Sequence, residues 1–229
     1  MTSLVTRDCD IRSALLSELN EQFSDPSHDL ILQEFGCNTA RIDVAVVNGA
    51  LHGFEIKSDS DTLSRLDAQI EQYSSVFDFV TLICGRKLFS SARSIVPKWW
   101  GLRIAHVQNE VVRFKEVRSP KQNIKQDKAA LARLLWKEEA LRCLKKNGHK
   151  RVNSKNSAEE IWKEAARQLE LETLAGEARS SIRARGGSGF EKLSTPNDGL
   201  CTIESTALLD HYSENLAWLL SQRSPRLRD

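Results

Sequence analysis

The chain has 229 residues, 40% hydrophobic and 28% charged, which suits one good-sized domain or two small ones. No apolar run reaches the ~18 residues of a membrane-spanning helix, and the N-terminal segment lacks the basic-then-apolar order of a secretion signal. A cytoplasmic location is therefore expected. The five cysteines are scattered and form no Cys-x-x-Cys pair, which argues against a disulfide framework and a zinc site.

The net charge of +2 is unevenly distributed along the chain. Residues 1–120 hold 13 Lys/Arg against 16 Asp/Glu, a net charge of −3, whereas residues 121–185 hold 16 against 9, a net charge of +7. A basic segment after an acidic one suggests that the basic segment contacts nucleic acid. Amphipathic helices with solvated faces are the alternative explanation.

The first half of the chain predicts an α/β or α+β domain on a mixed sheet. Apolar spacing predicts a helix over 10–23, with Asp8 or Asp10 as its cap. A second helix is expected within 58–77. Runs of apolar and alternating residues predict strands over 30–35, 41–47, 50–57, 78–85, the end of 95–107, and 110–117.

From residue 125 the pattern becomes helical. Helices are expected over 127–148, ending at Gly148, and over 157–185, beginning with a capping box of Ser157 and Glu160. A flexible linker over 186–199 and a short helix over 207–220 complete the chain. The expected organisation is a core over 1–120, a basic helical region over 121–185, and a C-terminal linker and helix over 186–229.

The most strand-like stretch of the chain, residues 41–59, contains charged residues that are costly to bury unless they are paired. Glu55 and Lys57 are two apart in one strand and therefore project to the same side, whereas Ile56 points away into the core. Asp43 lies on the preceding strand, and its side depends on the register of the hairpin.

The dipeptide Asn48-Gly49 predicts a tight hairpin loop, and the length of this loop sets the register. A two-residue turn would direct Glu55 away from Asp43. A three-residue loop or a bulge reverses the parity and places Asp43, Glu55 and Lys57 on one face. A functional role for these residues therefore predicts that the loop is not a plain two-residue turn.

On a shared face, Asp43 and Glu55 suit a hard cation such as Mg²⁺, with the carbonyl of Ile56 as a further oxygen ligand. Lys57 would then hold an attacking water or stabilise charge on a phosphate, which together supports metal-assisted phosphodiester hydrolysis. The alternative is a salt-bridged strand pair, in which Arg41 and Lys57 balance the two carboxylates.

The stretch from about Glu34 to Trp100 resembles the PD-(D/E)XK nuclease superfamily and, within it, the bacterial Sce7726-like group. Asp43 matches the aspartate of the superfamily motif, and residues 55–57 match its Glu-x-Lys. Ile42 stands where the motif takes its proline. The resemblance implies a restriction-endonuclease-like fold, a mixed sheet flanked by helices and followed by a helical region, with Mg²⁺ or Mn²⁺ as cofactor.

The resemblance also implies roles for residues outside the hairpin. Gln69 and Tyr73 match a Gln-x-x-x-Tyr that follows Glu-x-Lys in many of these nucleases, and their spacing of one helical turn gives them a common face. They would position the backbone or the attacking water, with helix packing as the alternative for Tyr73. Glu34 is the first choice for a further metal ligand, and Glu18 or Glu21 is the second.

Two further groups have both a functional and an ordinary explanation. Arg65 would grip a phosphate beside Asp59 and Asp61, or these two acids cap the helix while Arg65 forms an ion pair. Trp99 and Trp100 would stack an unpaired base, or pack in the core.

Residues 142–155 carry six Lys/Arg and no acidic residue, at a helix end and a loop. Cations and backbone amides in such a segment suit phosphates. The expected nucleic-acid-binding residues are Arg65, Lys145, Lys146, Lys150 and Arg151. Cations favoured at a helix C-terminus, without a ligand, are the alternative.

The leading hypothesis from the sequence is a metal-dependent nuclease that hydrolyses phosphodiester bonds of DNA or RNA. A second is a catalytically silent nucleic-acid-binding module of the same fold. A third is a regulatory partner in a defence, repair or mobile-element system. The expected partner is nucleic acid, foremost DNA, with a homodimer or protein partner compatible with all three.

Overall fold

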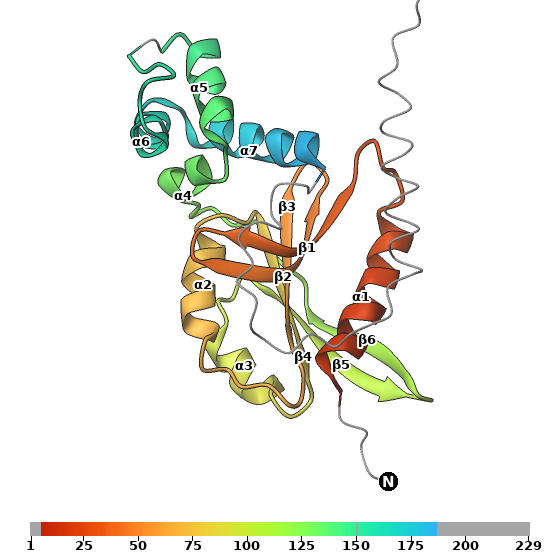
Figure 1. Cartoon of the computed structure of the whole chain (residues 1–229). Helices are drawn as coiled ribbons and strands as arrows, with labels where there is room; N and C mark the ends of the chain where they lie inside the picture. Colours follow the sequence, from red (N-terminus) through yellow and green to blue (C-terminus); the bar gives the residue numbers. More distant parts are fainter. Residues whose placement is uncertain (1–5, 150, 187–229) are drawn as a thin grey trace, which may run out of the picture. The chain divides into compact units, whose positions relative to one another are not determined.

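The computed structural model describes residues 6–149 and 151–186, and within these residues one six-stranded sheet is flanked by seven helices (Figure 1). The strands lie side by side in chain order. The three central strands β3, β4 and β5 run parallel, whereas the outer neighbours pair antiparallel. The strands are β1 (Leu30–Cys37), β2 (Ala40–Val47), β3 (Leu51–Lys57), β4 (Phe79–Gly85), β5 (Gly101–Gln108) and β6 (Val111–Arg118). The expected α+β class with a mixed sheet is confirmed.

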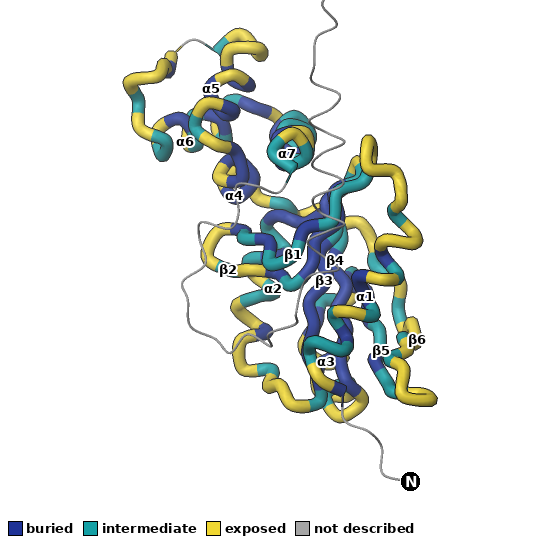
Figure 2. Tube along the Cα trace, turned by 45° about the vertical axis from the view of Figure 1, so that its right-hand side comes forward, coloured by how far each residue is buried: buried dark blue, intermediate teal, exposed yellow. Residues whose placement is uncertain are grey.

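Helices cover both faces of this sheet. Helix α1 (Asp8–Gln22) packs on one face, and α2 (Leu66–Ser74) and α3 (Phe89–Ile95) lie on the other (Figure 1). Strands β3 and β4 are buried along nearly their whole length (Figure 2). Burial on both faces explains why these strands are almost continuously apolar in sequence.

Each of the two long helices expected after residue 125 is in fact a pair of shorter helices. The four are α4 (Lys128–Arg133), α5 (Lys137–Lys146), α6 (Ala158–Gln168) and α7 (Leu171–Arg185). Between α4 and α5 the chain buries Leu134 and Leu135, and the N–H of Trp136 donates to the Glu139 carboxylate at 2.7 Å to start the next helix. Between α6 and α7, Leu169 is extended and buried. The breaks arise because tertiary burial of leucines outweighs helix continuity.

The four C-terminal helices share their core with the sheet. Asp78, next to β4, accepts a hydrogen bond from the Leu51 N–H at 2.7 Å and forms an ion pair with Arg179 of α7 at 3.1 Å. The Asn123 side chain donates to two carbonyls at the end of α2. Buried residues of both regions form one hydrophobic cluster. The division at residue 120 stays a prediction about domains, because the packing continues across it.

Some of the predicted helix-capping residues are confirmed, and others are not. The Ser157–Glu160 capping box is confirmed, and Gly148 follows α5 with φ +83°. Asp8 and Asp10 do not cap α1, because Arg7 holds the N-cap position and the two acids lie in the first turn. The helix expected within 58–77 is confirmed as α2, which begins only at Leu66.

The reason for the late start of α2 is a turn held by side chains. The Asp61 carboxylate accepts hydrogen bonds from the N–H and the hydroxyl of Ser58 at 2.6 and 2.7 Å. Asp59 accepts from Thr6 and from the Lys87 N–H. Neither acid caps a helix; both fix the loop after β3 instead.

Several expectations fall on parts of the chain that are not described. The linker over 187–199 and the helix over 207–220 lie outside the described residues, as does Lys150. Among the residues that are described, no helix has the length and apolar character that crossing a membrane requires.

The close packing of β3 predicts a strong effect of a small substitution. A Cβ at Gly53 would collide with Ile42 Cδ1 and press on the Phe77 ring, and both side chains are fully buried. We expect Gly53→Ala to lower the free energy of unfolding by about 1–3 kcal/mol, measured by urea denaturation. Gly36→Ala in β1 is the control, because an added Cβ there would have no atom within 4 Å apart from those of its chain neighbours. Equal stability of the two variants would contradict this packing.

Candidate functional site

The register of the β2–β3 hairpin decides where its charged residues lie. Val44 pairs with Phe54 and Val47 with Leu51, so the loop consists of three residues, with Gly49 at φ +99°. The prediction that the loop is not a plain two-residue turn is confirmed. One position beyond the Val44–Phe54 pair, this register places Asp43 across from Glu55. A two-residue turn would have placed Asp43 across from Phe54 instead.

Glu55 lies at the centre of a buried hydrogen-bond cluster. Its side chain is 3% exposed, and Oε1 accepts from Lys57 Nζ at 2.6 Å and from Gln69 Nε2 at 2.7 Å. The Tyr73 hydroxyl lies 2.8 Å from Oε2. The strand thus supplies the acid and the lysine, and α2 supplies the amide and the phenol. Four of the predicted site residues are brought together here.

The environment of Glu55 favours its neutral form. Burial, and after it the negative charge of Asp43, raise the pKa of Glu55 to about 7 against the opposing effect of Lys57. The Tyr73 hydroxyl also lies 2.7 Å from the Arg41 carbonyl, and its single proton serves one acceptor at a time. When Tyr73 donates to Arg41, a protonated Glu55 can donate to Tyr73, so the geometry accommodates both protonation states.

Asp43 stands where β2 and β3 separate. Their backbone pairing ends at Val44 and Phe54, and beyond it the Ile56 N–H donates to Asp43 Oδ2 at 2.6 Å. The Arg12 guanidinium of α1 donates to Asp43 Oδ1 at 2.7 Å and to its carbonyl at 3.1 Å. The aspartate therefore replaces a strand-to-strand hydrogen bond and anchors the first helix.

Arg12 is the central residue that the sequence reasoning missed. It forms ion pairs with Asp8 at 3.3 Å, with Glu34 at 2.7 Å and with Asp43 at 2.7 Å. Burial alone would lower the pKa of Arg12, but the three carboxylates reverse this and raise it. Only the spacing of Asp8 and Arg12, one helical turn apart, signalled this pairing in the sequence. Glu34 joins the cluster as expected, and its backbone has φ +52°.

Other predicted residues lie apart from this cluster. Glu18, the second choice for an acid, pairs with Arg103 at 2.7 Å, and Glu21 is exposed. Arg65 is exposed at the start of α2. Trp100 is fully buried, with its ring stacked near Tyr73 at 6.1 Å between centroids, so packing, and not base stacking, is its role.

The cluster as arranged is compensated by the chain's own cations. Arg12 neutralises Asp43 and its neighbours, Lys57 neutralises Glu55, and Arg41 pairs with Glu34 at 2.6 Å. Among the described residues, no group of three or more His, Cys, Asp or Glu side chains could hold a metal ion. This arrangement fits the salt-bridged alternative, with Arg12 in place of Arg41 as the partner of Asp43.

Because the oxygens of Asp43 and Glu55 already accept hydrogen bonds from the chain, they do not form a ready cation site. A ligand role for the Ile56 carbonyl and for Glu34, and the expected Mg²⁺ or Mn²⁺, stay predictions from the sequence.

Comparison with known proteins defines the family. The sequence pattern of the family described as bacteriophage P4 protein cII matches residues 2–198, and the chain therefore belongs to this family. Protein cII of Enterobacteria phage P4 is 43% identical to the chain over 75 residues, which are 33% of this chain and 28% of that protein. The match thus spans little more than a quarter of this curated relative.

One solved structure resembles the chain weakly. A protein of unknown function from Silicibacter pomeroyi is 19% identical and superposes with a TM-score of 0.36, over 63% of this chain and 94% of its own. A likeness of this strength says nothing further about the fold or the site.

The family finding corrects the interpretation drawn from the sequence. The assignment to the PD-(D/E)XK superfamily and its Sce7726-like group is wrong, since the matching family is that of phage P4 protein cII. The same match overturns the predicted nuclease function, the enzyme class of Mg-dependent phosphodiesterase and the description as a hydrolase. The physical reason is that Asp with Glu-x-Lys also suits a compensated charge cluster.

The role of Arg12 leads to a stability prediction. Arg12→Gln leaves Asp8 and Asp43 without their cation, whereas Glu34 keeps Arg41, so we expect the free energy of unfolding at neutral pH to fall by roughly 2–3 kcal/mol. Urea denaturation measures this loss. Arg167→Gln removes the ion pair of an exposed arginine with Glu164 and serves as the control, with a much smaller expected effect because exposed pairs contribute little. A loss no larger for Arg12→Gln than for the control would contradict the central role of Arg12.

The raised pKa of Glu55 predicts a pH dependence of stability. Between its unfolded value near 4.5 and its folded value of about 7, the native state holds a proton that the unfolded state has lost. The stabilisation is complete below this window and is lost as the pH rises through it.

We therefore expect the stability of the wild type, relative to Glu55→Gln, to fall by roughly 2–3 kcal/mol between about pH 4.5 and pH 8. Denaturation curves at both pH values test this. Glu71→Gln, an exposed carboxylate on α2, should follow the wild type. Parallel pH profiles of wild type and Glu55→Gln would show that Glu55 does not titrate in this window.

Proposed function

We propose that the protein binds nucleic acid through the phosphate backbone, with the end of α5 and the loop that leads to α6 as the contact surface. The observation that carries the proposal is a set of exposed cations. Within the described part of the chain, none of them forms an ion pair with an acidic side chain. They are Arg142, Lys145, Lys146, Arg151 and Lys155.

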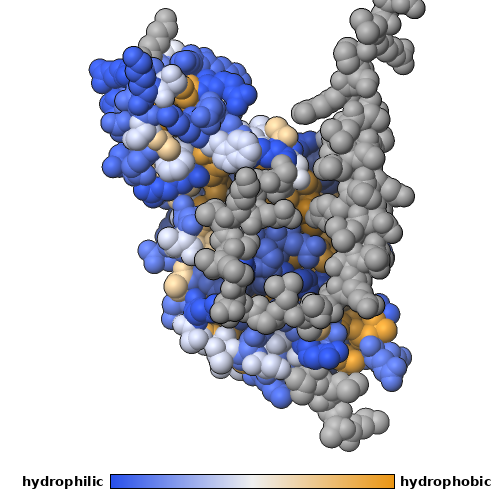
Figure 3. Space-filling view, in the orientation of Figure 1, coloured by the Kyte–Doolittle hydropathy of each residue, from blue (hydrophilic) through white to orange (hydrophobic). Residues whose placement is uncertain are grey.

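Such cations are suited to phosphates because no acidic side chain in the described part of the chain forms an ion pair with them. Neutralising phosphates releases condensed counterions, which makes this type of binding favourable, insensitive to base sequence and dependent on salt. Both acidic residues of α5, Glu138 and Glu139, lie in its first turn, whereas Lys145 and Lys146 lie in its last turn, so the net charge is positive toward the C-terminal end of the helix. The surface over α4–α6 is largely hydrophilic (Figure 3).

The described residues 151–157, which carry the last two of these cations, are held by contacts with one another. Val152 is buried, and the side chain of Asn153 accepts from the Lys155 N–H at 2.9 Å. Asn156 accepts from the Asn153 N–H, also at 2.9 Å. A preordered loop loses less conformational freedom on binding, which favours affinity.

The proposed role is binding, as in a regulatory or architectural protein, without a chemical step. The family name states no activity, so the charges of this chain carry the proposal. Of the residues expected from the sequence, Lys145, Lys146 and Arg151 belong to this surface; no described contact joins Arg65 to it. A cytoplasmic location is part of the proposal, whereas a restriction-endonuclease-like classification of the sheet stays a prediction.

The test is a triple substitution of two cations at the end of α5 and one in the loop that follows. Lys145→Gln, Lys146→Gln and Arg151→Gln together should weaken the binding of a fluorescently labelled oligonucleotide by at least about tenfold, because each cation compensates phosphate charge. Fluorescence anisotropy measures the dissociation constant.

The control carries the same change in net charge at another place. Arg93→Gln, Lys98→Gln and Lys115→Gln remove three exposed cations of α3, the following loop and β6. We expect this variant to keep most of the affinity. An equal loss in both triple variants would mean that only net charge matters and would overturn the proposed surface.

A further inference from the structure

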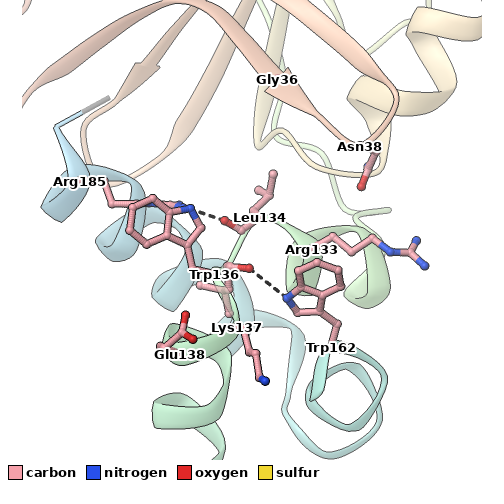
Figure 4. Close-up of a pocket in the computed structure, with 10 residues that line it drawn as sticks. Gly36, Asn38, Arg133, Leu134, Trp136, Lys137, Glu138, Trp162 and Arg185 are labelled. Carbon is pink, nitrogen blue, oxygen red and sulfur yellow. Dashed lines mark hydrogen bonds between the residues drawn. The ribbon is translucent and has the colours of Figure 1, made fainter. Parts of the chain in front are cut away.

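A pocket of about 500 Å³ opens beside the start of α5, bordered by α4, α6, the end of α7 and the turn between β1 and β2 (Figure 4). Its volume is in the range of pockets that hold small molecules and cofactors. Two tryptophans and three cations dominate its lining: Trp136, Trp162, Arg133, Lys137 and Arg185.

The aromatic wall of the pocket includes a ring that the fold leaves half exposed, with the Arg185 guanidinium over one face. Trp136 is 48% exposed, although it is the largest kind of apolar side chain. Its backbone N–H starts α5 through Glu139, a contact that does not need the indole. The Trp162 indole N–H donates to the Leu135 carbonyl at 3.0 Å, which fixes this second ring in the wall. An exposed aromatic ring in the lining of a pocket offers a flat apolar surface on which a ligand can pack.

Two cations of the pocket donate hydrogen bonds to backbone carbonyls. Lys137 donates to the Ser154 carbonyl at 2.9 Å, and Arg185 donates to the Leu134 carbonyl at 2.9 Å. Carbonyl partners are neutral. Arg185 also lies over the Trp136 ring, 4.7 Å from its centroid, and 3.6 Å from the Glu139 carboxylate.

Arg133 has an acidic partner, but a weak one. Its ion pair with Glu159 at 3.1 Å is exposed on both sides, and such pairs contribute little. A ligand phosphate could therefore recruit Arg133 with little loss. The one acidic residue in the described lining is Glu138, so the lining carries more positive than negative charge.

A half-exposed aromatic ring near Arg133 and Lys137 matches the chemistry of a nucleotide. We propose that this pocket binds the base of an unpaired nucleotide, stacked on Trp136, with Arg133 and Lys137 at its phosphates. Stacking on an aromatic side chain is tolerant of base identity, because every base has a π face. The inference rests on the proposed function and deepens it, since it specifies single-stranded nucleic acid as the ligand.

The pocket is continuous with the basic surface. The hydrogen bond from Lys137 to Ser154 brings the α5–α6 loop, with Lys155 next in the chain, to the rim of the pocket. The ten residues of α5 span about 15 Å, from Trp136 to the lysines at its end. A strand with one base in the pocket can therefore extend its phosphates along these cations.

The experiment compares two single strands that differ only in their bases. The probes are a labelled oligothymidylate of about 12 nucleotides and the same strand with abasic sites, which keeps the phosphates. We expect the full chain to bind the strand with bases roughly tenfold more tightly. Trp136→Leu should abolish this preference, and Trp136→Phe should retain most of it.

The outcomes separate the two proposals. Equal affinity of the wild type for both strands would overturn the pocket assignment and leave phosphate binding in place. Failure of the wild type to bind either strand would overturn both. Thermal unfolding checks the variants, and should Trp136→Leu fail to fold, the comparison of the two strands with wild type and Trp136→Phe decides the question alone.

Discussion

The contact of Asp43 with Arg12 and with the Ile56 N–H is the constraint on which the arrangement of the sheet's charged residues depends. It joins α1 to the hairpin, ends the pairing of β2 with β3, and leaves space for Glu55 and its three donors on the side of α2. Because a buried carboxylate without a partner is strongly destabilising, Asp43 depends on its pairing with Arg12, which it shares with Asp8 and Glu34. The three-residue loop at Gly49 makes this possible, since it sets the register that places the two acids across from each other.

Features that depend on nearby residues could be predicted from the sequence. The hairpin, the common side of Glu55 and Lys57, and the approach of Gln69 and Tyr73 follow from spacings of two and four residues. Arg12 was missed because its partner Asp43 is 31 positions away, and no local pattern joins them. The nuclease assignment failed for a related reason: an aspartate, a gap and Glu-x-Lys describe residue types and spacing, but do not show whether a metal or an arginine balances the charge.

The limits of sequence reasoning are similar in the helical region. Neither break, at Leu134 to Trp136 or at Leu169, contains a glycine or proline, so an uninterrupted helix was the natural prediction. The tryptophans show the same effect. The adjacent pair Trp99 and Trp100 suggests a stacking site from the sequence, yet Trp100 is fully buried. Trp136, by contrast, remains half exposed beside cations. Which aromatic residue is available to a ligand depends on tertiary packing, and hydrophobicity along the chain does not reveal it.

The two charged regions of the protein therefore have different roles in this account: the cluster around Asp43 and Glu55 is balanced internally, and the surface from Trp136 to Lys155 is directed toward a polyanion. The salt dependence of nucleic-acid binding by the unmodified chain tests this most directly. Between about 50 and 200 mM salt, the logarithm of the binding constant should fall linearly with that of the salt concentration, with a slope of about −2 or steeper for several phosphate contacts. Undetectable binding, or an affinity that does not change with salt, would contradict the account.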